Sequence, residues 1–487
     1  MENMSQELSI LEYIQKYTGD DGRLHAPRSI GEAYGTAQKG TSLTFADGML
    51  DGMTMYDGPA PVDVHGLCRA VEKASDGDFE NAFLEAFQFF QKEDADMLSS
   101  IDDLTDWVRD HTDTLHAGHL LHFSLMALLG SKDINITKLG LSLLELIDTS
   151  TVKEARKAIM TLALSDEFTL FCTFAAETWP DKNEAIFSMA RHVSGWGRIF
   201  AVNRLEPATE EIRDWLLAHG CDNDVLAQYT ACKVAGDVDL VSLLERPHLS
   251  HEDYKKAGRI VEALTEDGPA DGLSEFPKKE ELLKAYFQQT ERQVPDIEDL
   301  TNVYRLLCYV HQNMDGDKEQ YRLKQLGGAL ICSRHCKDTV MAAMKKGEGY
   351  TLASAMGLDC REAARQCIET DPLRHIDLLP YVLGKDRYAN QAVIALYEKA
   401  LPLGEIAFAI SDDDGASELF ERKYIELSQV LQCLGNYPAL GEKLIRAALR
   451  SPSRQNQNMA RRVIEAWREK GYVPPRDIHD LLHAAAE

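Results

Sequence analysis

The chain has 487 residues, a formal net charge of −27, and 44% hydrophobic and 27% charged residues. This length exceeds one ordinary domain, so we expect two or three globular units or one elongated array. The negative charge disfavours nonspecific nucleic-acid binding. No apolar run approaches the roughly 20 residues of a membrane helix, and the first residues are acidic rather than basic, so we expect no membrane contact and a cytoplasmic location.

Residues 1–64 are predicted to be an irregular, acidic and glycine-rich region with one helix, which lies within residues 1–18 and ends before Gly19. From residue 20 to residue 63, glycines interrupt every helical spacing, and Pro59 and Pro61 close the segment. Loops of this length are commonly functional. A short strand is possible only at residues 41–45.

Within residues 45–59 of this region, three aspartates each precede a glycine: Asp47, Asp51 and Asp57. Their spacing does not match the alternating carboxylates of a calcium loop. Because aspartate and glycine are typical turn residues, we interpret all three as turn-forming.

Helical spacing resumes at residue 65. Phenylalanines recur three or four residues apart at Phe79, Phe83, Phe87 and Phe90, which is typical of a core stripe and predicts a seal between the N-terminal region and the following helices. His116, His119 and His122 are spaced so that they share one helix face, where they can pack, cap or hold a metal ion. Packing is favoured, because the sequence lacks the carboxylate of an HExxH motif.

Residues 151–264 carry the clearest pattern of short amphipathic helices. The copy within residues 194–220 has apolar residues three or four apart on both sides of a break: Ile199, Val202, Leu205, then Ile212, Trp215 and Leu216. Pro207 is expected in the first turn of the second helix, where its missing N–H is harmless. Gly220 is expected as a left-handed C-terminal cap.

The same start and stop signals recur along this stretch. Helix starts are predicted near Thr151, Ser165, Pro180, Ser194, Pro207, Asp222, Asp237 and Ser250. Thr151 with Glu154, and Ser250 with Asp253, have the spacing of capping boxes. Starts fall roughly every 14 residues. One pair of such helices cannot bury its apolar stripe alone, so neighbouring pairs must stack.

This periodicity resembles that of HEAT and armadillo repeat proteins over roughly two thirds of the chain. The Gly-Trp-Gly-Arg run at residues 195–198 is also similar to one in bacterial HEAT-like proteins, some of which carry a limonene hydroxylase label. No residues here justify such chemistry. The resemblance implies an all-α fold, an α-solenoid of HEAT-like helical pairs with an irregular N-terminal region, and a role in binding other macromolecules.

The predicted organisation is therefore an irregular region (1–64), a helical repeat array (65–264), a hinge or linker (265–279) and a second array (280–487). The hinge contains proline breaks and no apolar spacing. The chain has ten cysteines, which we expect to be reduced core thiols because no secretory signal precedes them.

Two Cys-x-x-His pairs in the second array are candidate zinc ligands: Cys308 with His311, and Cys332 with His335. Residues three apart share a helix face, so two facing helices can present two sulfurs and two nitrogens to a tetrahedral zinc ion. Ordinary semi-buried side chains are the alternative interpretation. No cofactor is therefore expected, and zinc at these four residues is the alternative.

The C-terminal helices carry a basic cluster that is a candidate partner-binding surface: Arg446, Arg450, Arg454, Arg461 and Arg462. A turn at residues 451–453 is expected to end one helix before Arg454. Such a cluster can bind an acidic peptide or nucleic-acid backbone, or it can be a solvated helix surface.

We expect a macromolecular binding scaffold whose helical surface binds a protein or peptide partner. One alternative is an enzyme or metalloprotein with a site among the His and Cys clusters. Another is an immunity-like or inhibitor protein that binds a basic partner, since residues 1–120 hold 23 acidic residues against 8 basic ones. No phosphate loop, nucleophile elbow or dinucleotide motif is present, so no catalytic residue is predicted.

Overall fold

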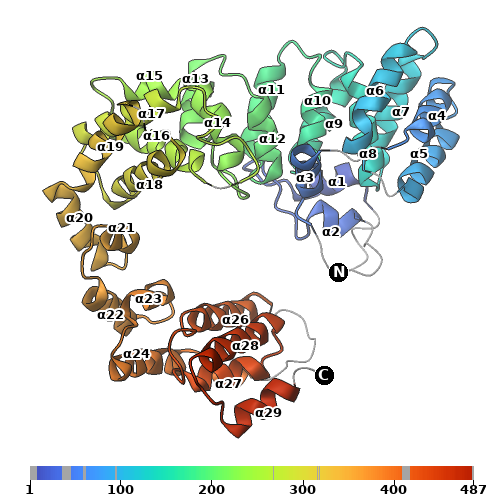
Figure 1. Cartoon of the computed structure of the whole chain (residues 1–487). Coiled ribbons are helices and arrows are strands. Elements are labelled where there is room, and N and C mark those ends of the chain that lie inside the picture. The colour runs from blue at the N-terminus through green and yellow to red at the C-terminus, as the bar shows by residue number, and fades with distance from the viewer. Residues whose placement is uncertain are drawn as a thin grey trace. The chain divides into compact units, whose positions relative to one another are not determined.

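The computed structural model describes residues 8–35, 45–58, 62–93, 96–266, 268–314, 316, 318–407 and 417–484. In these ranges the protein is all-α, with 29 α-helices and no strand (Figure 1). The strand predicted at residues 41–45 falls mostly on residues 41–44, which lie outside the described ranges. None of the helices in the described ranges is both long and apolar enough to cross a membrane.

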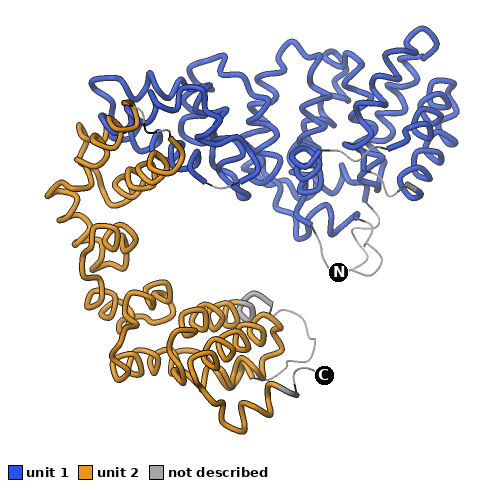
Figure 2. The backbone as a smooth tube through the Cα atoms, viewed as in Figure 1, with its two compact units in different colours: residues 1–289 blue, residues 290–487 orange. Residues whose placement is uncertain are grey.

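The chain divides into two compact units, residues 1–289 and 290–487 (Figure 2). Unit 1 contains α1 (Ile10–Tyr17), α2 (Ile30–Tyr34), α3 (Met49–Asp57), α4 (His65–Ser75), α5 (Phe79–Glu93), α6 (Ile101–Asp110), α7 (Ala117–Gly130), α8 (Ile134–Glu145), α9 (Lys153–Leu162), α10 (Thr169–Ala175), α11 (Lys182–His192), α12 (Trp196–Arg204), α13 (Glu210–His219), α14 (Gln228–Asp237), α15 (Leu240–Leu244), α16 (His251–Leu264) and most of α17 (Lys279–Arg292). Residues 265–279, the predicted hinge, pack within unit 1 through the buried Leu273 and Phe276.

The eight helices α9–α16 correspond one to one to the eight predicted helix starts. Some local details differ. The predicted capping box at Thr151 is wrong, because α9 begins at Lys153 and has no side-chain cap. Pro207 precedes the helix rather than opening it, and Thr209 caps α13 by accepting a hydrogen bond from the Ile212 N–H. Ser250 caps α16 by accepting a hydrogen bond from the Asp253 N–H, which is one half of the predicted capping box.

Gly220 is not a left-handed cap, since its backbone is right-handed (φ −65°). A side chain at this position would meet the Leu216 carbonyl oxygen at 2.6 Å and the Val234 side chain at 2.7 Å. Glycine is therefore required here because α13 and α14 approach closely, not because the backbone turns to the left.

From α8 to α16, every second helix of unit 1 belongs to one continuous layer. Helix α8 packs against α10, α10 against α12, α12 against α14, and α14 against α16. We call α8, α10, α12, α14 and α16 the inner layer. All seven residues of α10 are buried, because this helix has neighbours of the layer on both sides. Sequential pairs such as α11 and α12 also pack together, which is a repeat-like arrangement.

The N-terminal region departs from the sequence prediction. Helix α1 forms within the predicted residues 1–18, and Ser9 and Glu12 make a capping box at its start. Residues 20–63 are not without helices, however, because they contain α2 and α3. Helix α2 also starts with a capping box, formed by Ser29 and Glu32.

The phenylalanine stripe packs mainly on the helices of its own unit. Phe83 stacks on Phe123 of α7 with ring centroids 4.3 Å apart, and Phe89 and Phe90 are buried. Phe87 is 45% exposed. The stripe therefore joins α5 to α7 in part, and the predicted seal against the N-terminal region does not include Phe87.

Unit 2 contains the remaining helices: α18 (Ile297–Asn313), α19 (Lys318–Ile331), α20 (Arg334–Met344), α21 (Tyr350–Ala355), α22 (Arg361–Thr370), α23 (Leu379–Val382), α24 (Arg387–Ala400), α25 (Leu403–Ile406), α26 (Ser417–Gln432), α27 (Glu442–Arg450), α28 (Arg454–Glu469) and α29 (Arg476–Ala484). Its core runs from Leu300 to Ile478. Trp467 is fully buried there and its indole N–H donates to the Leu434 carbonyl oxygen.

Candidate functional site

Helix α3 lies on the inner layer and is attached to it by buried charges. The Lys138 ammonium on α8 contacts the Asp51 carboxylate of α3 at 2.7 Å and the Glu167 carboxylate at 2.6 Å. Glu167, two residues before the start of α10, also accepts a hydrogen bond from the Gly48 N–H. Asp51 is thus a buried anchor, and its interpretation as a turn residue is wrong.

In this cluster one buried cation, Lys138, contacts two carboxylates, Asp51 and Glu167. This arrangement and the burial of the groups determine the direction of the pKa shifts. Burial, together with the nearby Glu167 charge, raises the pKa of Asp51 to about 6 although Lys138 opposes the shift. The Asp51 Oδ1 atom is buried without a hydrogen-bond partner. Burial disfavours the charged form of Lys138, but the two carboxylates outweigh it and raise the pKa of the ammonium. The cation therefore stays charged, and burial makes Asp51 easier to protonate than an exposed aspartate.

Glycines on α3 let it approach Trp196 of α12. A Cβ atom at Gly52 would lie 2.3 Å from the Trp196 ring, and one at Gly48 would lie 3.0 Å from the Trp196 Cβ. Tyr56 continues the contact to Tyr229 of α14, with ring centroids 4.7 Å apart. Helix α3 therefore spans the inner layer from α8 to α14.

The Gly-Trp-Gly-Arg run forms the start of α12 and binds Asp166. The N–H groups of Gly195 and Gly197 both donate to the Asp166 Oδ1 atom, at 3.0 and 2.7 Å. Burial raises the pKa of Asp166 to about 6 in spite of these two hydrogen bonds. A Cβ atom at Gly197 would meet the Thr169 hydroxyl at 2.5 Å. The run is thus explained by packing, and its last residue enters a pocket.

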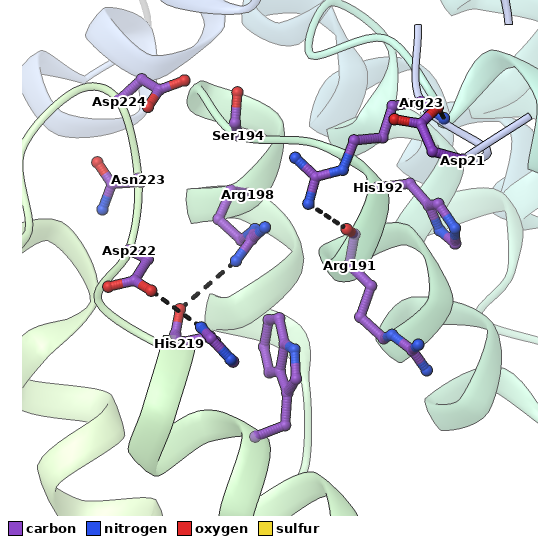
Figure 3. A pocket seen from close by; sticks show the side chains of 11 residues that line it. Asp21, Arg23, Arg191, His192, Ser194, Arg198, His219, Asp222, Asn223 and Asp224 are labelled. Atoms are coloured by element: carbon purple, nitrogen blue, oxygen red, sulfur yellow. Dashed lines mark hydrogen bonds and ion pairs between the residues drawn. The ribbon is translucent and has the colours of Figure 1, made fainter. Parts of the chain in front are cut away.

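A polar pocket of about 570 Å³ lies beside this run, within the size range of small-ligand sites. Its walls come from the turn after α1, the end of α11, the start of α12, the end of α13 and the loop between α13 and α14 (Figure 3). The residues that line it are Asp21, Arg23, Arg191, His192, Ser194, Arg198, Trp215, His219, Asp222, Asn223 and Asp224. Three arginines and three aspartates thus surround one space.

Arg198 is the buried member of the pocket, with 6% of its surface exposed. Its Nε donates to the Val193 carbonyl oxygen at 2.9 Å, and its Nη1 donates to the His219 carbonyl oxygen at 3.5 Å. The guanidinium also lies over the Trp215 ring, 5.1 Å from its centroid. Burial, followed by the charge of Arg23, lowers the pKa of Arg198.

Arg23 reaches the same space from the N-terminal region. Its Nη2 donates to the Arg191 carbonyl oxygen at 3.2 Å, at the end of α11. Figure 3 shows its guanidinium group directed toward that of Arg198, while Asp222 and Asp224 lie on the loop across the pocket. The turn that carries Arg23 contains Gly22 at φ 75°, close to the His192 ring.

The pocket contains a histidine and a carboxylate but no activated nucleophile. His219 Nδ1 and Asp222 Oδ2 are 3.0 Å apart. Within the described residues, no hydrogen bond joins Ser194 to either of them, although a hydroxyl nucleophile needs a base within hydrogen-bond reach. In the described residues, Ser194 therefore has no base positioned to take its proton.

The three histidines at or near the start of α7 contact residues of α4 and α5, and the rings of His116 and His119 also pack together, with centroids 5.5 Å apart. His119 Nδ1 is 2.6 Å from the Ser75 carbonyl oxygen, and Phe79 packs against both His119 and His122. The His116 N–H donates to the Ser75 hydroxyl. These contacts agree with the packing interpretation.

The structure does not bring the predicted zinc ligands into one cluster. Cys308 and His311 lie on α18, Cys332 follows α19, and His335 lies on α20. In the described ranges, no group of three or more His, Cys, Asp or Glu side chains is arranged to hold a metal ion. His335 Nε2 instead lies 3.0 Å from the Pro295 carbonyl oxygen.

The predicted basic cluster is divided between two helices and is partly neutralised. Arg446 and Arg450 lie on α27, and the turn predicted at residues 451–453 separates them from Arg454, Arg461 and Arg462 on α28. Arg446 pairs with Glu442 at 3.1 Å and with Asp477 at 2.5 Å. Arg450, Arg454 and Arg462 are exposed.

Sequence reasoning missed the pocket and the Lys138 cluster. Arg23 and Arg198 are far apart in the chain, and Lys138 lies in a helix whose other residues are mostly apolar. One signal was present, since an isolated lysine in a buried stripe implies a carboxylate partner elsewhere. No local spacing identifies that partner.

The chain was compared with protein-family models, with curated proteins and with solved structures, and none of the three comparisons yields a match.

Proposed function

We propose that the chain is a HEAT-like α-solenoid that serves as a binding scaffold for another protein or a peptide. One observation carries this proposal. The inner layer continues through five successive alternate helices, each packed on the next, which is the way in which repeat proteins build an extended binding surface.

The inner layer already binds one helix of its own chain. Helix α3 contacts α8 through Lys138 and α12 through Trp196, and Gly48 at its start donates to Glu167, in the turn before α10. Repeat surfaces take helices or extended peptides in this manner. The same layer next to α3 is thus suited to a segment of a partner.

The basic residues of α27 and α28 supply a second contact surface in the proposal. In the described part of the chain, Arg450, Arg454 and Arg462 have no carboxylate within ion-pair distance, whereas Arg446 is paired twice. Exposed unpaired arginines are enriched where proteins bind carboxylates or phosphates. We therefore assign binding of an acidic segment to Arg450, Arg454 and Arg462 rather than to Arg446.

Small-angle X-ray scattering of the intact chain tests the solenoid. A compact globule of 487 residues has a radius of gyration of about 23 Å. A solenoid gives a clearly larger radius of gyration and a correspondingly larger maximum dimension. A value near that of the globule, in monomeric and monodisperse protein, overturns the solenoid and with it the extended surface.

Selection of peptides from a displayed random library tests the binding role. Peptides enriched by the intact chain are expected to carry acidic residues and to lose at least tenfold in affinity for the double variant Arg450→Glu and Arg462→Glu. The matched control is Arg334→Glu, since Arg334 is an exposed arginine on α20 of the same unit. Equal binding by both variants rules out the basic surface, and the absence of any enriched peptide counts against the scaffold.

A further inference from the structure

The polar pocket holds an arrangement of charges that is incomplete in the structure. Arg23, Arg191 and Arg198 all line it, and in the described residues none of the three has a carboxylate within ion-pair distance. Asp21 pairs with His25, and Asp222 pairs with His219, so two of the three aspartates already have partners. The arginines thus face the pocket without a direct ion pair among the described residues, and the charges of Asp222, Asp166 and Asp224 act on Arg198 only from beyond ion-pair distance.

The hydrogen bonds of Arg23 and Arg198 hold the two side chains in place, but they do not neutralise the two positive charges. Each guanidinium has five N–H donors, of which Arg198 uses two and Arg23 uses one for side-chain bonds, all to carbonyl oxygens at helix ends. Helix C-terminal carbonyls carry only a partial negative charge. Most donors of the two groups therefore remain available to a ligand.

The two guanidinium groups also repel each other. After burial, the charge of Arg23 is the largest cause of the lowered pKa of Arg198, and Figure 3 shows the two groups directed toward the same space. Bringing two cations together, one of them 6% exposed, is unfavourable unless an anion lies between them. Planar N–H forks match the oxygen pairs of phosphate and carboxylate.

We propose that this pocket is an oxyanion-binding site, in which Arg198 and Arg23 clamp a phosphate or carboxylate group from opposite sides. A single phosphate fills only part of about 570 Å³. The remaining wall includes Asp224, an exposed carboxylate that has no ion pair among the described residues. The ligand class is therefore a compact molecule with an oxyanion at one end and an ammonium group at the other.

This inference goes beyond the scaffold function and does not rest on it. Calorimetric titration of the intact chain with inorganic phosphate tests the clamp directly. Arg23→Gln is expected to weaken phosphate binding at least tenfold, because the variant removes one charged fork. Arg23 is exposed, so this variant keeps the fold. Arg28→Gln is the control, since Arg28 is an exposed arginine on the same N-terminal segment outside the pocket.

Further ligands separate the possible sources of the oxyanion. Acetate reports on a carboxylate, inorganic phosphate on a free ion, and O-phosphoserine on a phosphate borne by an amine-containing molecule. Asp224→Asn is expected to weaken O-phosphoserine several-fold and to leave inorganic phosphate unchanged. Arg198→Lys keeps one charge but loses the fork, so it weakens both phosphate ligands while circular dichroism reports an intact helical fold.

Two results overturn the proposal. One is the lack of any heat of binding with acetate, inorganic phosphate and O-phosphoserine alike. The other is equal affinity of Arg23→Gln and Arg28→Gln for phosphate, which places the anion outside the clamp. Either result leaves the peptide selection unaffected, so failure of the pocket and failure of the scaffold remain distinguishable.

Discussion

Helices α9–α16 and helix α3 are held in the same unit by different forces. Each of the former buries an apolar stripe against its neighbours, as Ile199 and Val202 do at 0% exposure. Helix α3 does the reverse, since it buries Asp51 and Gly52 and exposes Leu50 and Met53. Apolar stripes tolerate small shifts, whereas a buried ion pair requires one particular partner. The comparison predicts that α3 depends on a few residues and that the array does not.

Replacement of Lys138 is expected to have the largest effect. Lys138→Met leaves the Asp51 and Glu167 carboxylates buried without their cation, which costs about 3–5 kcal/mol of unfolding free energy. Urea denaturation followed by circular dichroism measures the loss. Adding Asp51→Leu and Glu167→Gln to Lys138→Met is expected to restore much of it. Lys157→Met, on the exposed face of α9, is the control, and equal stability of the two single variants contradicts the buried anchor.

Acidification is expected to raise the free energy of unfolding through two buried carboxyl groups, Asp166 next to α12 and Asp51 on α3. The pKa of Asp166 is raised by burial to about 6 in the folded chain, above the ordinary value of about 3.9. The folded state therefore binds the proton more tightly, and stability rises as the pH falls from 7 towards 4, by about 1–3 kcal/mol. Burial likewise raises the pKa of Asp51 to about 6, which adds to the same rise.

Asp166→Asn sharpens this prediction. Both glycine N–H groups donate to a single oxygen of Asp166, so an amide oxygen can accept both bonds without a titrating charge. Urea midpoints at pH 7 and pH 5 are expected to differ less for Asp166→Asn than for the unmodified chain. Asp214→Asn, an exposed change of equal charge on α13, corrects for the general effect of net charge. An unaltered pH slope in Asp166→Asn refutes the assignment.

A methyl group at Gly52 is expected to loosen α3 alone. The added Cβ would lie 2.3 Å from the Trp196 ring, and overpacking of this kind costs about 1–3 kcal/mol. Hydrogen exchange measured by mass spectrometry is expected to accelerate in residues 49–57 and not in α9–α16. Gly236→Ala is the matched change, because this exposed helical glycine has nothing within 4 Å of an added Cβ. It is expected to stabilise α14 by up to about 1 kcal/mol.

The smallest effect concerns a helix cap within the array. Thr209→Ala removes the hydroxyl that accepts from the Ile212 N–H, with an expected loss of about 1 kcal/mol. Thr151→Ala is expected to change stability by less than about 0.5 kcal/mol, because α9 has no side-chain cap. Thermal unfolding of the two variants side by side checks the difference. A larger loss at Thr151 favours the capping box that the sequence predicts.

The helices of the array were predictable because their signals are local. Start residues such as Ser250, and breaks such as Pro207, act within one turn of the chain. Helix α3 was missed because its buried face carries Asp51 and Gly52, so that its pattern resembles a series of turns. Its helical state depends on Lys138 and Trp196, which are distant in sequence.

The candidate site was less predictable than the fold. The sequence shows the run at residues 195–198 only as a similarity to other proteins. That its backbone N–H groups bind Asp166 depends on where the fold places Asp166, and no local spacing gives that position. The charged clamp needs Arg23 and Arg198 together, and the chain offers no periodicity that relates them. For the zinc ligands, the sequence predicts a site that the fold does not form. The spacing within each Cys-x-x-His pair suits a zinc ion, but in the described ranges the separate helices do not bring the side chains into one cluster.

The stacking of Arg198 over Trp215, at 5.1 Å, gives the pocket an optical reporter of its own. Cations near an indole ring alter its excited state, so any molecule that draws the guanidinium away from the ring changes the emission of Trp215. The chain has five tryptophans, and the difference in emission between the unmodified chain and a Trp215→Phe variant isolates this signal. Fluorescence emission then reports whether the pocket is occupied, without a label and without knowledge of the natural ligand.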